Sequence, residues 1–132
     1  MRILIIGLRG TGKSFFCKQH KNDDTLFFDL DRIAEAFRLA GLDEERHKPA
    51  RLMANDLLKG FVEHGEQYVE TIAIIRMAPN ISEIKMICPD LLVICNKKYI
   101  QKEIDDEEKA LKKINAARKY AHACGITVRE LN

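Results

Sequence analysis

Residues 2–14 are Arg2-Ile3-Leu4-Ile5-Ile6-Gly7-Leu8-Arg9-Gly10-Thr11-Gly12-Lys13-Ser14. The first five form a short apolar, largely β-branched run that ends at Gly7, which predicts a strand buried on both faces. Residues 7–14 match the motif G-x-x-x-x-G-K-[ST] at every defined position. A helix is predicted from Ser14 to about Lys21, so the glycine-rich segment lies between a strand and a helix.

This segment has the chemistry of a phosphate-binding loop. Glycines let the backbone fold closely around phosphate oxygens, while the loop amides and the positive helix N-terminus face the anion. Lys13 would reach the β- and γ-phosphates of a nucleotide, and the Ser14 hydroxyl would bind Mg²⁺. We therefore expect ATP and Mg²⁺ as ligands. The residues expected to bind the nucleotide are Gly7, Arg9, Gly10, Thr11, Gly12, Lys13, Ser14 and Phe15.

The rest of the chain alternates short apolar runs with segments of helical periodicity. The further strands are predicted at residues 26–28, 72–75, 91–95 and 126–128. The further helices are predicted at residues 31–40, about 49–64, 81–87 and 105–124. This alternation predicts a single α/β domain spanning residues 1–132, a three-layer α/β/α sandwich with a mainly parallel five-stranded sheet. Such sheets bind ligands beyond the carboxyl ends of their strands.

Two of these helices show apolar stripes that should face the sheet. In the helix after Pro49, the stripe comprises Met53, Leu57 and Phe61 beside Ala54, Leu58 and Val62. In the last helix, the inner stripe comprises Leu111, Ile114, Ala117, Ala121 and Cys124. Asp105 is expected to cap that last helix, with Glu108 as its reciprocal partner. The helix over residues 31–40 is expected to end at Gly41.

Composition excludes several classes of protein. The formal net charge of +2 argues against a protein that mainly coats nucleic acid, and 46% hydrophobic residues argue against disorder. No apolar run approaches the ~20 residues that span a bilayer, and no signal-peptide layout is present, which predicts a cytoplasmic location. The cysteines are too few and too dispersed for a disulfide framework or a zinc site.

The loop motif, together with the strand–helix order over nearly the whole chain, resembles the P-loop NTPase superfamily and, within it, the small P-loop kinases. The Asp29-Leu30-Asp31-Arg32 ending of the second strand is most similar to the polynucleotide-kinase group and to small ATP-binding proteins of bacteriophages. The resemblance implies a kinase-like fold that binds ATP·Mg under a flexible lid. Kinases of this branch are usually longer, so the acceptor site would be reduced, shared with a partner, or absent.

This resemblance also implies roles for the residues after the second strand. In such kinases an acid takes the proton of the acceptor hydroxyl, and an arginine three residues later holds an acceptor phosphate. Asp29 with Arg32 reproduces that spacing, whereas an alternative alignment places Asp31 as the acid and leaves no matching arginine. A carboxylate near the γ-phosphate can orient and deprotonate the nucleophile. The alternative is that Asp29 or Asp31 only caps the following helix.

Basic residues follow the later strands. Arg76 stands at the end of the third strand, where many relatives carry a metal-binding acid, and it would bind a transferred or acceptor phosphate or else form a structural ion pair. The segment Asn96-Lys97-Lys98-Tyr99 lacks the aspartate that recognises guanine, which argues against a GTPase. Lys97, Lys98 and Lys102 would form a short lid, or only a solvated turn.

A second basic group comes early in the third predicted helix. Arg46, Lys48 and Arg51 would border an acceptor groove for a nucleic-acid end, with a solvated helix face as the alternative.

These observations leave three classes of function. The first is an ATP-dependent phosphotransferase acting on a hydroxyl of a nucleoside, nucleotide or polynucleotide end, with Lys13, Asp29, Asp31, Arg32 and Arg76 as catalytic candidates. The second is a nucleotide-binding regulatory or assembly module with weak or no ATPase activity, working with a protein partner or as a homodimer. The third, a motor-type ATPase, is disfavoured because the chain lacks a strand-end acid pair and room for a coupling domain.

Overall fold

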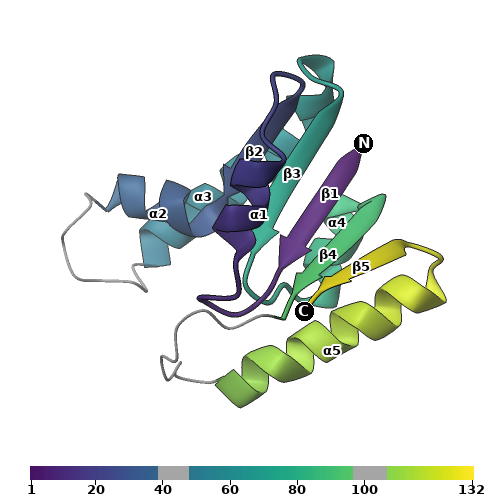
Figure 1. The fold of residues 1–132 in the computed structure, drawn as a ribbon. Helices are drawn as coiled ribbons and strands as arrows, with labels where there is room; N and C mark the ends of the chain where they lie inside the picture. Colours follow the sequence, from purple (N-terminus) through teal and green to yellow (C-terminus); the bar gives the residue numbers. More distant parts are fainter. Residues whose placement is uncertain (39–47, 97–106) are drawn as a thin grey trace.

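The computed structural model describes residues 1–38, 48–96 and 107–132, and within them strands and helices alternate as the sequence predicts (Figure 1). The strands are β1 (Arg2–Ile6), β2 (Thr25–Asp29), β3 (Thr71–Arg76), β4 (Leu91–Cys95) and β5 (Thr127–Leu131). The helices are α1 (Lys13–Gln19), α2 (Leu30–Phe37), α3 (Lys48–His64), α4 (Ile81–Ile87) and α5 (Glu107–Ala123), with a 3₁₀ turn η1 (Gly65–Gln67) after α3.

The five strands form one parallel sheet in the order β2-β3-β1-β4-β5. At the end of the central strand, Ile6 is level with Arg76 of β3 and with Ile94 of β4. Because all strands run in the same direction, their carboxyl ends meet at one edge of the sheet. The segment that follows β1 therefore begins between the ends of β3 and β4.

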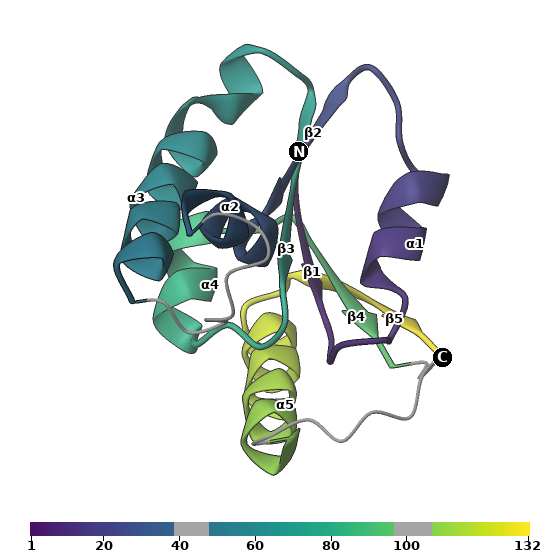
Figure 2. The same ribbon diagram turned by 90° about the vertical axis from the view of Figure 1, so that its left-hand side faces the viewer.

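The helices cover the two faces of the sheet unequally. Figure 2 shows α1 on one face, with α2, α3 and α4 on the other. Two separate apolar cores correspond to these faces. The core beneath α1 consists of Ile5, Phe16, Cys17, Ala73, Ile75, Val93 and Cys95. The opposite core is larger and includes side chains of α5, so the fold is the predicted three-layer α/β/α sandwich.

Most element boundaries lie within one or two residues of the sequence prediction, while β5 extends further, to Leu131. The bounds of α4 and β4 are as predicted, and β1 is buried, with Leu4, Ile5 and Ile6 at most 1% exposed. The helix predicted at residues 31–40 is α2, which ends earlier, at Phe37. The expected terminator Gly41 and the expected cap Asp105 of the last helix lie outside the described residues.

The predicted apolar stripes of α3 and α5 were only partly right. In α3 the buried row is Ala50, Ala54, Leu58 and Val62, whereas Met53 and Leu57 are 47% and 41% exposed. In α5 the buried row is Ala110, Ile114, Ala117 and Ala121. Leu111 and Cys124 of the predicted stripe are exposed. The sheet contacts one narrow row of positions spaced by three or four residues, and small alanines let the helix approach closely.

The cysteines and the helices also bear on the classes of protein that composition excluded. All four cysteines are free thiols, with Cys17 and Cys95 buried. Burial raises the pKa of Cys17 to about 11, so this thiol is inert near neutral pH. Among the described helices, none is both long and apolar enough to cross a bilayer.

Candidate functional site

The glycine-rich loop joins β1 to α1 at the carboxyl edge of the sheet. Gly7, Gly10 and Gly12 have positive φ angles of 155°, 75° and 91°. At Gly7 a side chain is also excluded by space, because a Cβ would lie 2.6 Å from both the Cys95 carbonyl oxygen and the Thr11 hydroxyl. The Gly7 amide donates to the Met77 carbonyl at 3.0 Å, so the loop begins in contact with the segment after β3.

Two side chains of the loop bond to its own backbone. The Thr11 hydroxyl donates to the Leu8 carbonyl at 2.6 Å, and Thr11 is buried. The Lys13 ammonium donates to the carbonyls of Gly7 and Leu8, the latter at 2.9 Å. Burial lowers the pKa of Lys13, because the ammonium loses part of its hydration. A phosphate placed in the loop would offer this ammonium a stronger, charge-assisted partner than a neutral carbonyl.

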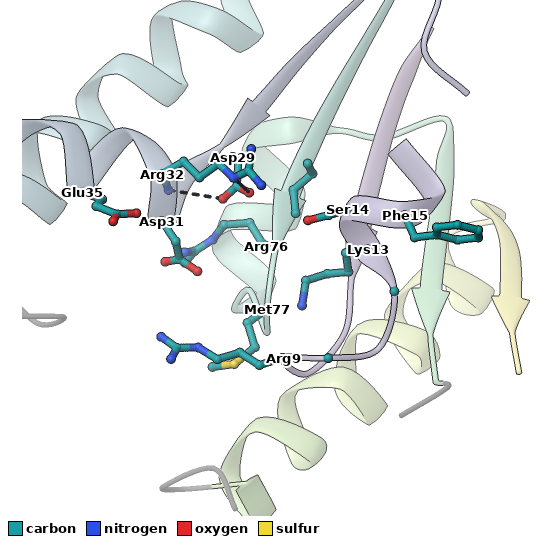
Figure 3. Close-up of a pocket in the computed structure, with 13 residues that line it drawn as sticks. Arg9, Lys13, Ser14, Phe15, Asp29, Asp31, Arg32, Glu35, Arg76 and Met77 are labelled. Carbon is teal, nitrogen blue, oxygen red and sulfur yellow. Dashed lines mark hydrogen bonds and ion pairs between the residues drawn. The ribbon is translucent and has the colours of Figure 1, made fainter. Parts of the chain in front are cut away.

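The loop forms one wall of a pocket of about 370 Å³. Figure 3 shows Lys13 on one side of this pocket, and Asp29, Asp31 and Arg32 on the other. The residues that line it are Arg9, Gly10, Gly12, Lys13, Ser14, Phe15, Asp29, Asp31, Arg32, Glu35, Ile75, Arg76 and Met77. The pocket therefore combines the loop, the ends of β2 and β3, and the first turns of α1 and α2.

Asp29 and Asp31 have different local structures. Asp29 is the N-cap of α2, and its carboxylate accepts the Arg32 amide proton at 3.4 Å. Burial raises the pKa of Asp29, and the neighbouring Asp31 carboxylate adds to the increase. Asp31 lies in the first turn of α2 and is exposed. The capping role proposed from sequence thus falls to Asp29, which at the same time lines the pocket.

The two arginines of the acceptor side are both paired with carboxylates. The Arg32 Nε lies 3.6 Å from Asp29 Oδ2, and this arginine is 72% exposed. Arg76, at the end of β3, forms a two-point pair with Glu83 of α4, with Nε–Oε2 at 2.9 Å and Nη2–Oε1 at 3.0 Å. The structural ion pair considered for Arg76 from sequence is therefore present, while the side chain still lines the pocket.

Nearly all the residues predicted from sequence meet in this pocket. Gly7 and Thr11 are not among its lining residues and are buried. Phe15 lines the pocket at its edge with a 57% exposed side chain, and its ring points away from Asp29 and Asp31 (Figure 3). Its contribution to a ligand would thus come from the backbone amide at the start of α1.

The sequence also predicted basic residues for an acceptor groove and for a lid. Those that the structure describes do not line the pocket. Lys48 and Arg51 in the first turns of α3 are not among its lining residues. Arg46 and the three lysines expected to form a lid, Lys97, Lys98 and Lys102, lie outside the described residues.

Two glutamates of the site, Glu35 and Glu83, were not predicted from the sequence. Glu35 lines the pocket from α2, one helical turn after Asp31, so the i, i+4 spacing could have found it. Glu83 follows the helix cap Asn80 by three residues, a spacing that predicts a capping box rather than a partner on the neighbouring strand.

The residues around Ser14 suit Mg²⁺ bound with a nucleotide. Within the described part of the chain, no cluster of three or more histidine, cysteine or acidic side chains could hold a metal by itself. Ser14, Asp29 and Asp31 nevertheless line one pocket and offer only oxygen ligands. Mg²⁺ commonly binds through one or two protein oxygens together with substrate phosphates and water, so this donor set fits.

Comparison with known proteins gives structural neighbours only. No protein-family model and no curated protein matches the sequence. A sugar kinase from Janibacter sp. HTCC2649 is similar in fold, with 15% identity and a TM-score of 0.47 over 98% of this chain and 83% of that chain. The shikimate kinase of Bacteroides thetaiotaomicron has 18% identity and a TM-score of 0.49, over 100% of this chain and 86% of that chain. Likeness at this level assigns no substrate or activity to the present chain.

Proposed function

We propose that this protein binds ATP·Mg in the loop between β1 and α1 and transfers the γ-phosphoryl group to a hydroxyl of a nucleoside, nucleotide or polynucleotide end. The observation that carries the proposal is the pocket itself, which has a volume of about 370 Å³. In it, Lys13 and Ser14 lie opposite Asp29 and Asp31. A phosphate-binding loop opposite a carboxylate suits phosphoryl transfer to a hydroxyl, because the carboxylate can orient and deprotonate the nucleophile.

In the proposed reaction the acceptor oxygen attacks the γ-phosphorus, and the bond to the bridging oxygen of ADP breaks. The acceptor proton passes to a carboxylate, either Asp29 or Asp31. Burial raises the pKa of Asp29, which makes its ionised form a stronger base than an ordinary aspartate. Mg²⁺, held by Ser14 and the nucleotide, would neutralise phosphate charge. Lys13, Arg76 and Arg32 would bind the transferred and acceptor phosphates.

A second candidate is a nucleotide-binding module with weak or no turnover. The specific observation in its favour is that Arg32 and Arg76 are already paired with Asp29 and Glu83. Paired arginines attract an acceptor anion less strongly than unpaired ones, because the neighbouring carboxylate offsets their positive charge. This candidate predicts tight nucleotide binding with no transfer to any acceptor.

The first test concerns the loop. Lys13→Ala should weaken ATP·Mg binding at least about tenfold, measured by calorimetric titration, because it removes the ammonium that would bind the β- and γ-phosphates. Lys18→Ala, in the last turn of the same helix and not among the pocket-lining residues, is the matched control and should bind as the wild type does. Equal affinity in the Lys13→Ala variant and the wild type would overturn the assignment of the loop.

The second test separates the two candidates. The protein is incubated with γ-labelled ATP and a panel of nucleosides, nucleotides and 5′-hydroxyl oligonucleotides. The kinase proposal expects label on one acceptor class, and loss of that label in the double variant Asp29→Asn with Asp31→Asn. Transfer that survives in the double variant removes the proposed base, whereas tight ATP binding without any transfer favours the module.

A further inference from the structure

Arg76 is fixed in place relative to the phosphate loop by the sheet. It is level with Ile6 in the parallel register of β1 and β3, one residue before Gly7. The next residue, Met77, accepts the Gly7 amide proton at 3.0 Å. The backbone on both sides of Arg76 is thus bonded to the strand and loop that would hold the phosphates.

Glu83 fixes the direction of the Arg76 side chain. Two parallel hydrogen bonds, at 2.9 and 3.0 Å, join the carboxylate to Nε and Nη2, and the side chains are only 13% and 22% exposed. A guanidinium has five N–H groups in one plane, so a two-point contact sets the orientation of that plane. Two N–H groups are used in this way, and three point elsewhere.

The start of α4 holds Glu83 in position for this contact. Asn80 is the N-cap, and its side-chain oxygen accepts the Glu83 amide proton at 2.9 Å and the Ser82 hydroxyl proton at 2.7 Å. In a complete capping box the glutamate side chain would bond back to the Asn80 amide. Here the Glu83 carboxylate binds Arg76 on the neighbouring strand instead.

We propose that Glu83 is a positioning residue for phosphoryl transfer. By holding Arg76 at the wall of the pocket, it directs the remaining N–H groups toward the phosphoryl group as that group leaves the nucleotide. Donors that are oriented before the reaction stabilise developing charge without the cost of reorganisation. The inference rests on the proposed function and adds to it a residue of α4, an element with no residue among those that line the pocket.

The test uses ADP with and without aluminium fluoride, which imitates the phosphoryl group in transfer, in Mg²⁺ buffer. Glu83→Gln retains the size of the side chain but loses its charge and one of its two acceptors. The expected affinity for ADP alone stays within about twofold, while affinity for ADP with aluminium fluoride falls on the order of tenfold. Glu66→Gln is the matched control, because Glu66 forms an ion pair with Arg2 at the opposite end of β1.

A charge swap distinguishes positioning from mere stabilisation. In the variant Arg76→Glu with Glu83→Arg, the ion pair is retained but the cation moves from β3 to α4. We expect the thermal stability of this double variant to be close to that of the wild type. Its affinity for ADP with aluminium fluoride should be as low as that of Glu83→Gln.

Three outcomes would overturn the role of Glu83 and leave nucleotide binding intact. In the first, Glu83→Gln binds ADP with aluminium fluoride as tightly as the wild type does. In the second, the charge-swap variant recovers that affinity. In the third, aluminium fluoride does not raise the affinity of the wild type for ADP. Failure of the wild type to bind ADP or ATP at all would instead overturn the proposed function itself, and this inference with it.

Discussion

Gly7 is the residue where the loop tolerates least change. A Cβ at this position would lie 2.6 Å from the backbone oxygen of Cys95 and from the Thr11 hydroxyl, and 3.1 Å from the Cys95 Cβ. Gly7→Ala should therefore lower the free energy of unfolding by about 1–3 kcal/mol, because backbone and a buried side chain must move. It should also abolish ATP·Mg binding, since Thr11, whose hydroxyl must move, is part of the loop. Chemical denaturation and calorimetric titration measure the two effects.

Gly60 provides the control for that substitution. It lies within α3, and a Cβ added there meets nothing within 4 Å. Gly60→Ala should stabilise the protein by about 0.5–1 kcal/mol, because alanine restricts the unfolded chain and favours the helix. Nucleotide affinity should be unchanged. If both glycine variants had the same stability and nucleotide affinity, the close packing of Gly7 against Cys95 would not explain the predicted loss in Gly7→Ala.

Asp29 predicts a pH dependence of stability. Its folded-state pKa lies above the ordinary value of 3.8, chiefly because the carboxylate is partly buried. A raised carboxyl pKa means that the folded state favours the protonated form. The stabilising effect is fully present below the unfolded pKa and is lost as the pH rises through the folded pKa. Asp29→Asn keeps a good N-cap and removes the ionisable group.

We therefore expect Asp29→Asn to be as stable as the wild type, or more stable, at about pH 7. The free energy of unfolding of the wild type should rise relative to that of the variant as the pH falls toward about 4. Urea unfolding at several pH values would measure this difference. If the wild type instead became less stable relative to the variant on acidification, the Arg32 contacts would affect the pKa of Asp29 more than burial does.

At the scale of elements, α4 depends on its cap. The Asn80 side chain accepts two hydrogen bonds at the helix start, and the helix is only seven residues long. Asn80→Ala should cost about 1 kcal/mol of stability, whereas Asn80→Asp should be nearly neutral. Thermal unfolding would measure both. An alanine variant as stable as the aspartate variant would show that α4 is held by its buried Ile84 and Ile87 alone.

Elements were predicted better than their contacts. Strands are short apolar runs and helices have a period of 3.6, so their order can be predicted from local sequence. Which row of a helix faces the sheet depends on the rotation of that helix about its own axis, which tertiary packing decides. In α3, Met53 and Leu57 are exposed while Ala54 and Leu58 are buried. Both rows have the same spacing, so periodicity could not separate them.

For the whole molecule, the site was predictable where one motif contains all its parts. Residues 7–14 are contiguous, and the loop they form has the predicted place between β1 and α1. Asp29 and Arg76 line the same pocket as the loop because β2, β3 and β1 are parallel and end at the same edge of the sheet. The pairing of Arg76 with Glu83 depends on the turn between β3 and α4, whose path no local pattern specifies. Sequence therefore located the pocket but not the partners of its arginines.

The unequal cores on the two faces of the sheet have a consequence for the ligand. Among the described residues, seven buried side chains form the core beneath α1, and twenty form the opposite one. Local opening of α1 therefore disrupts few contacts and requires less free energy than opening of the other face. A nucleotide that binds only the folded loop and helix raises the free energy needed to open α1 and the smaller core beneath it. Occupancy of the loop would thus be coupled to the order of the half of the molecule that has the least packing of its own.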